Sequence, residues 1–502
     1  MEYLKEKSKF LIYTTFVVFL FLLTFTALFF RARYNMYLFS DAAKIVHQKT
    51  VLLILSSLLM LALLILFIKF SSKLDRFRSI ILIPVVLMCS LTIQVFFILK
   101  FPTCFSADQE AVYYAAIHFL QSNFSAFQKG GYLYMYPNNI GITLFFAFLY
   151  SFLPHSIMVP KLFNVLFSLV TSFMIYLIYN ELNSNNKRNY GILILSCLFL
   201  PSILLNNFIY NDICSTTMFT CAVYFAIRFV RSQKISSIIL ASIFVSVGFY
   251  LRNVGIIFVI AMVLYFIFNS KSIKKTIPAL LIMLLMLQVP ILLSNSIIES
   301  KGIVKEPVGA NSAPVLMWVN IGIPTYNLGF WDDGKSYYQY TKDSNWNKSK
   351  STEIFKHEIA KKFSNSDILR LLKTYYEKIF WTWTEGTYES EYYGLGYNSI
   401  GGGYLYKTSL NQFLEDGSIY RSALMWVIYI FNFLMLCMIG FNIFDCLKKR
   451  DFSEELPVLI ILGFVTFYLI WEVKSRYIYP CYPYMIILSF KGLHNLIRKI
   501  TL

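Results

Sequence analysis

Long apolar runs separated by short polar segments follow one another along most of the chain. Most of these runs hold about 18–22 residues, the length with which a helix crosses roughly 30 Å of hydrocarbon. The runs predict about twelve membrane-spanning helices, at residues 10–30, 51–70, 79–100, 159–180, 190–209, 212–230, 235–251, 254–269, 276–296, 422–445, 455–473 and 477–493. The pattern therefore predicts an all-α polytopic membrane protein.

A shorter apolar stretch at residues 140–156 is predicted to enter the outer leaflet without crossing the membrane. Lys and Arg cluster in short segments between the long runs, and such clusters tend to stay in the cytoplasm. A crossing at 140–156 would move every later cluster to the opposite side. A re-entrant helix avoids this conflict, since such segments are tolerated where protein or water lines them. We therefore predict a multi-pass protein of the plasma membrane with both termini in the cytoplasm.

The predicted topology divides the chain into four parts. They are an N-terminal transmembrane hairpin at 1–78, a transmembrane module at 79–296 with a first outer loop at 101–158, an extracytoplasmic cap at 297–421, and C-terminal transmembrane helices at 422–502. The cap is polar, rich in Tyr, Trp and Gly, and too long for a simple connection, so it is predicted to fold as a small unit of mixed structure.

One outer loop departs from the charge rule. Residues 31–50 carry Arg31, Arg33, Lys44 and Lys49, yet the topology places them outside the cytoplasm. This departure suggests that the N-terminal hairpin is an addition to the rest of the transmembrane bundle.

Composition agrees with membrane embedding. Charged residues make up 14% of the chain and hydrophobic residues 57%, whereas soluble domains have about 25% charged residues. The net charge of +18 would suggest nucleic-acid binding in a soluble protein. Here the cations act as topology signals, so no nucleic-acid partner is expected. The 8 Cys and 5 His show no metal-ligand spacing, and no zinc site is predicted.

Two carboxylates in the first outer loop are candidates for chemistry. Asp108 and Glu110 come shortly after a span, at the start of a predicted amphipathic helix. The ordinary explanation is a favourable interaction with the helix N-terminus. The following segment is rich in aromatic and amide side chains, including Tyr136, Asn138 and Asn139. It reads as a binding surface, although interfacial aromatics also serve as plain membrane anchors.

Further polar residues are predicted at the same outer level of the membrane. Asp212, close to Tyr210, lies at the outer end of two adjoining spans, where an unused and unpaired carboxylate is costly. Lys161, Arg252 and Arg476 lie at that level on different helices. A single cation there usually extends to the interface to reach water. Several cations close to carboxylates suggest a phosphate site, because Lys and Arg bind phosphate by charge-assisted hydrogen bonds.

Carboxylates opposite cations suit transfer from a phosphate leaving group. A carboxylate can take a proton from an acceptor hydroxyl, and cations stabilise the charge that develops on a departing phosphate. The cap adds pairs of Trp and carboxylate that are typical of sugar contacts but equally of a compact interfacial fold: Trp331, Asp332, Trp383 and Glu385. No P-loop, dinucleotide-binding or nucleophile-elbow motif occurs in the sequence.

The order of these features along the chain resembles the GT-C glycosyltransferases. The residues concerned are Asp108, Pro137, 140–156, Lys161, Tyr210, Asp212 and Arg252. The resemblance is greatest to the bacterial relatives of the protein O-mannosyltransferases and of the lipid A aminoarabinose transferase. It covers residues 79–296 and, more weakly, 472–483, where Arg476, Tyr477 and Pro480 resemble an Arg-Tyr-x-x-Pro run near the C-terminus of that family.

Some positions differ from the family pattern. Pro137, Asn138 and Asn139 stand where the family usually has Pro-Pro-Leu before the re-entrant helix. Lys161 stands where relatives often have Arg. The N-terminal hairpin at 10–70 has no counterpart in the family's core module.

The resemblance implies a glycosyltransferase with its active site outside the cytoplasm. The donor would be a polyprenyl-phosphate sugar, and the acceptor a hydroxyl of a cell-envelope glycan, a teichoic-type polymer or a protein. Asp108 would be the catalytic base and Asp212 the second outer acid, while Lys161 and Arg252 would serve the lipid phosphate. No cofactor is expected; the alternative is a divalent cation such as Mg²⁺ or Mn²⁺ held by Asp108, Glu110 and Asp212.

Two other functions fit a polytopic protein of this kind. A flippase or transporter of a lipid-linked glycan would often show repeats and charges at the bilayer midplane, whereas here the charges lie near the outer edge and no repeat is visible. A polysaccharide ligase or polymerase would also act at the outer face, but on diphosphate-linked oligosaccharides. The sequence separates this last alternative poorly from sugar transfer.

Overall fold

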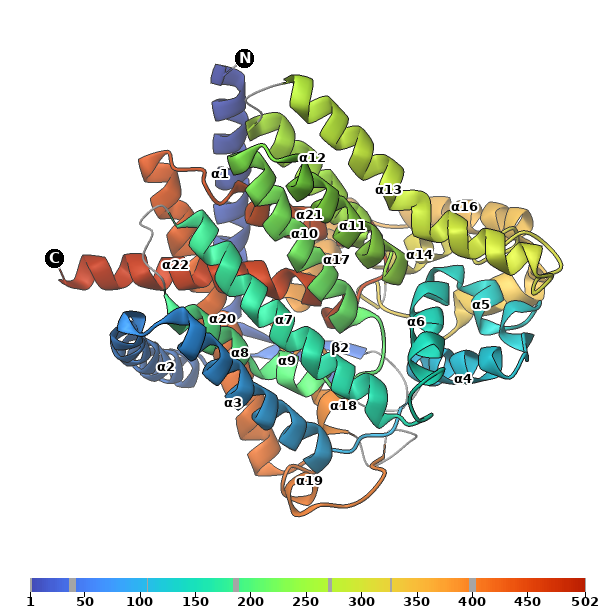
Figure 1. The fold of residues 1–502 in the computed structure, drawn as a ribbon, viewed down its shortest axis with the longest axis horizontal. Coiled ribbons are helices and arrows are strands. Elements are labelled where there is room, and N and C mark those ends of the chain that lie inside the picture. Colours follow the sequence, from blue (N-terminus) through green and yellow to red (C-terminus); the bar gives the residue numbers. More distant parts are fainter. Residues whose placement is uncertain are drawn as a thin grey trace.

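The computed structural model describes residues 2–35, 42–105, 107–183, 189–269, 273–325, 327–396 and 403–501. The described residues are overwhelmingly helical, and a single two-stranded hairpin is the only sheet among them (Figure 1). This confirms the predicted all-α architecture.

Long helices form a bundle of membrane-spanning length. Seven helices within the described ranges are long and apolar enough to cross a membrane: α1 (Glu2–Ala27), α2 (Thr50–Ser71), α3 (Ser79–Lys100), α7 (Met158–Leu182), α10 (Asp212–Ser232), α13 (Ile273–Ser300) and α20 (Ile419–Lys449). Three shorter apolar helices join them: α11 (Ile235–Leu251), α12 (Gly255–Asn269) and α21 (Glu455–Ile470). Leu55, Ile80 and Leu285 are among the many exposed apolar side chains on these helices, as expected for surfaces that contact lipid.

Two of the predicted spans differ from the structure for the same reason. The span predicted at 190–209 is broken into α8 (Tyr190–Cys197) and α9 (Leu200–Leu205), with Pro201 in the first turn of α9. The span predicted at 477–493 begins later, as α22 (Tyr482–Thr501), after the 3-10 turn η5 (Ser475–Cys481), which contains Pro480. Proline lacks an N–H and clashes with the preceding turn, so it favours a helix start over a helix interior.

The predicted re-entrant segment forms α6 (Ile140–Tyr150). Its 11 residues extend about 16 Å, too short to cross a hydrocarbon core of roughly 30 Å. It packs against α4 (Asp108–Leu120) and α11. A Cβ added at Gly141 would lie 2.2 Å from the carbonyl oxygen of Tyr250, so glycine permits this close approach to α11.

The connections at one end of the bundle contain the remaining short elements. They are η2 (Ser125–Phe127), α5 (Tyr132–Met135), η3 (Pro137–Asn139), α14 (Val315–Gly322), α15 (Lys335–Tyr338), the π-helical turn η4 (Gln339–Asp343), α16 (Lys348–Ser364), α17 (Ile368–Thr384), α18 (Ser390–Leu395) and α19 (Ser409–Phe413). A further 3-10 turn, η1 (Ser72–Arg76), links α2 to α3.

The region predicted as a cap interleaves with the bundle. On α17, the hydroxyl of Tyr376 donates to the carbonyl of Leu22 at 3.0 Å. Also on α17, buried Lys378 donates to the carbonyls of Gly322 at 2.5 Å and Trp471 at 2.7 Å, at the ends of α14 and α21. A cation is favourable at helix C-termini. Lys378 thereby fixes the start of the segment that leads into η5.

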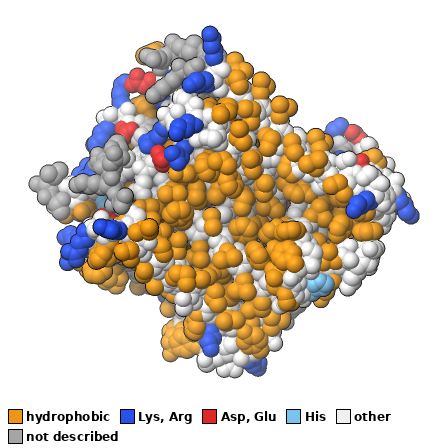
Figure 2. Space-filling view, in the orientation of Figure 1, with side chains coloured by type: hydrophobic (Ala, Val, Ile, Leu, Met, Phe, Trp, Pro, Cys, Tyr) orange, Lys and Arg blue, Asp and Glu red, His pale blue; other side chains and the backbone are white. Residues whose placement is uncertain are grey.

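Charged contacts gather at the opposite end of the bundle. Lys9 near the start of α1 pairs with Glu455 at 2.9 Å, and Arg450 after α20 pairs with Glu6 at 2.9 Å. Lys499 near the end of α22 pairs with Asp445 at 3.0 Å. The start of α1 and the end of α22 therefore lie on the same side of the bundle as the α20–α21 connection. Figure 2 shows Lys and Arg gathered toward the upper left, beside a broad field of hydrophobic side chains.

Candidate active site

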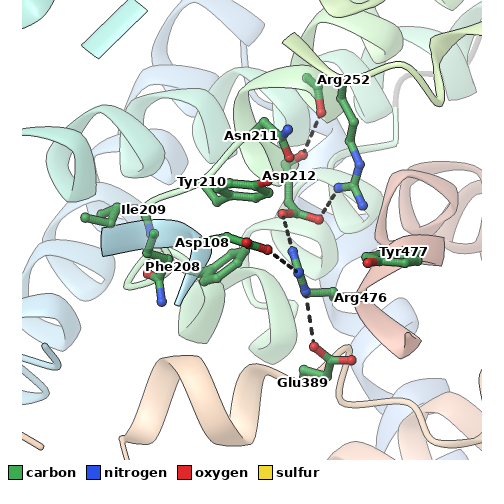
Figure 3. A network of polar contacts seen from close by, with 12 residues as sticks. Asp108, Phe208, Ile209, Tyr210, Asn211, Asp212, Arg252, Glu389, Arg476 and Tyr477 are labelled. Atoms are coloured by element: carbon green, nitrogen blue, oxygen red, sulfur yellow. Dashed lines mark hydrogen bonds and ion pairs between the residues drawn. The ribbon is translucent and has the colours of Figure 1, made fainter. Parts of the chain in front are cut away.

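Four separate segments bring charged side chains together at the end of the bundle away from the termini. Asp108 is the first residue of α4 and Asp212 the first residue of α10. Arg252 is the C-cap of α11, and Arg476 lies in η5. Figure 3 shows Asp212 between the two guanidinium groups, with the Asp108 carboxylate to the left of Arg476 and joined to it by a dashed line. A fifth segment adds Glu389, the N-cap residue of α18.

The backbone that presents two of these carboxylates is strained. Ala107, just before Asp108, has φ 51°, and the consecutive residues Tyr388 and Glu389 have φ 54° and 59°. Non-glycine residues in this conformation are disfavoured, and such positions concentrate at functional sites. The strain places the Asp108 and Glu389 carboxylates beside the same guanidinium.

Arg476 is the centre of the cluster. Its guanidinium lies 3.2 Å from an oxygen of Asp212, 3.2 Å from an oxygen of Glu389 and 3.9 Å from an oxygen of Asp108. The ring of Phe208 lies 4.9 Å and that of Tyr477 5.2 Å from the same group, an arrangement that favours a cation. Burial opposes the charge, but the carboxylates, Asp212 foremost, raise the pKa of Arg476 above its ordinary value.

The charges divide into a buried set and one accessible carboxylate. Arg252 forms an ion pair with Asp212, which is therefore held by both arginines. Arg252, Arg476, Asp212 and Glu389 balance one another, and all four are buried. Asp108 is the additional carboxylate, and its side chain is 45% exposed. It is thus the acid of this cluster that an incoming molecule can reach, whereas Asp212 serves as the counter-ion of the arginines.

A hydrogen-bond network orients the Asp108 carboxylate. The Tyr132 hydroxyl donates to Asp108 Oδ1 at 3.0 Å, and Asn139 Nδ2 donates to the Tyr132 hydroxyl at 2.9 Å. The Tyr210 hydroxyl in turn donates to Asn139 Oδ1 at 2.9 Å. Burial, followed by the nearby Asp108 charge, raises the pKa of Tyr132 well above its ordinary value, so its hydroxyl stays protonated and can donate. The centre of the Tyr136 ring lies 5.2 Å from that of the Tyr132 ring, so Tyr136 packs beside this network.

Several residues predicted for the site lie outside this network. Glu110 is exposed, and residues two apart on a helix do not face each other, which explains why it points away from Asp108. Asn138 is exposed and donates to Asn139 at 3.3 Å. Buried Lys161 donates to the backbone oxygen of Thr103 at 2.6 Å, and no carboxylate among the described residues lies within ion-pair distance of its ammonium.

The cap residues have structural contacts instead of facing the cluster. Asp332 accepts from the backbone N–H of Ser336 at 3.0 Å and so holds the start of α15. Trp383 is buried and packs edge-on against Phe19 at 5.9 Å, and Trp331 packs partly buried in an apolar cluster of the cap. Buried Glu385 accepts from the backbone N–H of Thr387 at 3.0 Å and shapes the turn that leads to Glu389. These contacts give the four residues structural roles, and their contact with sugar stays a prediction.

Sequence reasoning missed Glu389 and Tyr132. Glu389 has the same kind of sequence surroundings as Glu391, which pairs with Arg421 at 3.0 Å, away from the cluster. Tyr132 belongs to the aromatic run that was predicted as a binding surface, but nothing in its spacing distinguishes it from Tyr134 or Tyr136. Neither residue had a sequence signal of its own.

The carboxylates converge on a guanidinium. Within the part of the chain that the structure describes, no group of three or more His, Cys, Asp or Glu side chains is arranged to hold a metal ion. Arg476 lies among Asp108, Asp212 and Glu389, so its charge compensates those acids directly.

Comparison with known proteins agrees with this architecture. A family model described as dolichyl-phosphate-mannose-protein mannosyltransferase matches residues 141–293, which run from α6 into α13 and include Asp212 and Arg252. A search of curated proteins found no match to the chain. The match covers less than a third of the chain, and together with the bundle of apolar helices it supports a membrane glycosyltransferase of the GT-C type.

Proposed function

We propose that the protein transfers a sugar from a polyprenyl-phosphate donor to a hydroxyl of a cell-envelope acceptor at the extracytoplasmic face, with Asp108 as general base. The observation that carries this proposal is the position of one accessible carboxylate, Asp108, beside the buried Arg476, which shares Asp212 with the buried Arg252. The carboxylate suits the acceptor hydroxyl, and the arginines suit the phosphate that leaves.

In the proposed reaction the acceptor oxygen attacks the anomeric carbon while its proton passes to Asp108. The bond between the anomeric carbon and the phosphate oxygen breaks, and its electron pair stays on the phosphate. Arg252 and Arg476 stabilise that charge with those N–H donors that their carboxylate partners leave available. Asp212 and Glu389 are held by arginine, so Asp108 is the one carboxylate of the cluster left to react. One reacting carboxylate fits a single displacement at the anomeric carbon.

The position of the chain ends supports the proposed sidedness of the site. The cluster lies at the end of the bundle opposite to the pairs Glu6–Arg450 and Asp445–Lys499. The positive-inside rule assigns the end that bears the termini and the basic clusters to the cytoplasm. The cluster then faces the outer leaflet, where the proposed donor and acceptor meet.

The glycans of a deletion strain provide the experiment for this proposal. We expect mass spectrometry of its cell-envelope polymers to show loss of a side-chain sugar from a polymer of normal length. A ligase or polymerase would instead produce loss of the whole polymer, and that result would contradict the proposal.

Metal removal provides a second prediction. Because Arg476 supplies the positive charge beside the three carboxylates, we propose a metal-independent reaction and expect EDTA to change the transfer rate less than twofold. The rate is measured on purified protein before and after dialysis against the chelator. Loss of transfer that Mg²⁺ or Mn²⁺ restores would show instead that a cation binds to Asp108 and its neighbours.

The substitution Tyr132→Phe tests the network around Asp108. It removes a hydrogen bond to an ionised group, which is typically worth about 1.5–3 kcal/mol when buried, and we expect kcat to fall about tenfold with little change in donor KM. Tyr134→Phe is the matched control, because the Tyr134 hydroxyl donates to Glu306 and not to Asp108. Equal rates for Tyr132→Phe and the unaltered protein would exclude this orienting role.

A further inference from the structure

The β-hairpin that connects α1 to α2 places unexpected positive charge at the active-site end of the bundle. Strands β1 (Phe30–Asn35) and β2 (Ala42–His47) connect α1 to α2 at the end away from Glu6 and Lys9. The two strands pair antiparallel, with Arg33 directly opposite Lys44. Both side chains are exposed.

These two cations repel each other in the protein alone. Residues directly opposite in an antiparallel pair have Cβ atoms about 4.5–5.5 Å apart, and like charges at such positions are destabilising. Among the described residues no carboxylate lies within ion-pair distance of Arg33 or Lys44. An anion placed between them would relieve the repulsion and gain hydrogen bonds from both.

The backbone of the hairpin is held firmly. Trp381, buried on α17, donates from its indole nitrogen to the carbonyl of Arg33 at 3.0 Å. The guanidinium of Arg31 lies 4.8 Å from the ring of Trp426 and 4.5 Å from that of Tyr429, both on α20. Arg31 therefore anchors the hairpin, while Arg33 and Lys44 remain available on its surface.

Three tyrosine rings in succession link the hairpin to the charged cluster. The Tyr34 ring is 6.4 Å from that of Tyr392, and the Tyr392 ring is 4.7 Å from that of Tyr393. The Tyr393 ring lies 5.7 Å from the Arg476 guanidinium. Tyr34 follows Arg33 on the strand, so its side chain lies on the other face of the hairpin. An acceptor of several units that passes the edge of the hairpin could contact Arg33, Lys44 and Asp108 together.

We propose that Arg33 and Lys44 form a clamp for a phosphate group of the acceptor. This inference rests on the proposed function and specifies the acceptor as a phosphate-bearing chain. The donor phosphate already has Arg252 and Arg476 as proposed partners, so the clamp serves a second phosphate. Arg offers paired N–H donors and Lys a point charge, a combination that suits phosphate oxygens.

The test measures binding without any sugar transfer. The protein, in nanodiscs of neutral phosphatidylcholine, is titrated with a short fluorescent oligomer of glycerol phosphate and with a neutral glycerol oligomer of equal length. For Arg33→Gln/Lys44→Gln we expect about fivefold to tenfold weaker binding of the phosphate oligomer. The neutral oligomer should bind equally to both proteins, and added salt should reduce the difference between them.

Two further variants control for charge and folding. Lys301→Gln/Lys305→Gln removes two exposed cations from the loop after α13 and should bind the oligomer like the unaltered protein. The exchange Arg33→Lys/Lys44→Arg keeps both charges and should retain most of the affinity. A variant whose size-exclusion profile differs from that of the unaltered protein is replaced by the single substitution Lys44→Gln, for which a smaller loss is expected.

Specific outcomes would overturn the clamp. Equal affinity of all variants for the phosphate oligomer would do so, and so would an equal loss in the Lys301/Lys305 control. Weaker binding to phosphatidylglycerol vesicles with unchanged oligomer binding would assign Arg33 and Lys44 to membrane lipid instead. Because the assay needs neither donor nor catalysis, its failure leaves the role of Asp108 untouched, and a failure of sugar transfer leaves the binding result intact.

Discussion

Replacing Asp108 with Asn is expected to lower kcat for sugar transfer by about 10²–10⁴-fold, the usual contribution of a general base. Asn keeps the size of the side chain and an oxygen that can accept the hydrogen bond from the Tyr132 hydroxyl. It cannot take the proton of the sugar acceptor's hydroxyl. Because the Asp108 side chain is partly exposed, we expect normal amounts of protein in the membrane. Initial rates with a polyprenyl-phosphate sugar measure the effect.

Glu110→Gln is the matched comparison for this prediction. Glu110 lies two residues away on the same helix and is exposed, so its substitution changes the charge of the loop without touching the network around Asp108. We expect it to retain at least half of the transfer rate. Full transfer by Asp108→Asn, or equal losses in the two variants, would contradict the role of Asp108 as base.

Replacing Arg476 with Met is expected to impair both folding and transfer. The substitution leaves Glu389 as a buried carboxylate that has lost its arginine, and breaking a buried pair in this way typically costs about 3–5 kcal/mol. We expect a lower thermal-unfolding midpoint in detergent and no measurable transfer. The loss of transfer has two sources, reduced folding and loss of charge beside the leaving phosphate.

A double substitution separates these two effects. Arg476→Met/Glu389→Gln removes the buried positive and negative charges together, so we expect it to recover much of the unfolding midpoint lost in the single variant. Transfer should remain absent, since the proposed phosphate contact is still missing. Recovery of transfer in the double variant would show that Arg476 acts only as a counter-ion of Glu389.

Much of the fold could be predicted from run length and charge placement. The length of the apolar runs predicted the long helices. The side on which the basic clusters fall predicted that 140–156 does not cross the membrane. The helix formed there, α6, has 11 residues and is too short to cross. The sequence did not predict the break between α8 and α9 or the delayed start of α22. In both places the apolar run continues through a proline, which interrupts the regular helical hydrogen bonding without lowering the average hydrophobicity.

The candidate site was predictable only where topology determined it. Asp108, Asp212, Arg252 and Arg476 lie at helix ends at one end of the bundle, so counting spans was enough to bring them to one level. Glu389 depends on two consecutive residues with positive φ, and such a turn has no signature when neither residue is glycine. For the cap residues the sequence could not distinguish sugar contact from a structural role, because Trp and carboxylate side chains pack and cap helices as readily as they bind sugars.

The most direct test of the central claim follows a labelled sugar in proteoliposomes that contain the purified protein, a polyprenyl-phosphate sugar and a hydroxyl acceptor on the side of Asp108. We predict that the label moves to the acceptor while an equal amount of polyprenyl phosphate is released. The Asp108→Asn protein should bind the donor without releasing it. Movement of the intact donor to the other leaflet without release of polyprenyl phosphate would make the protein a transporter and would contradict the account.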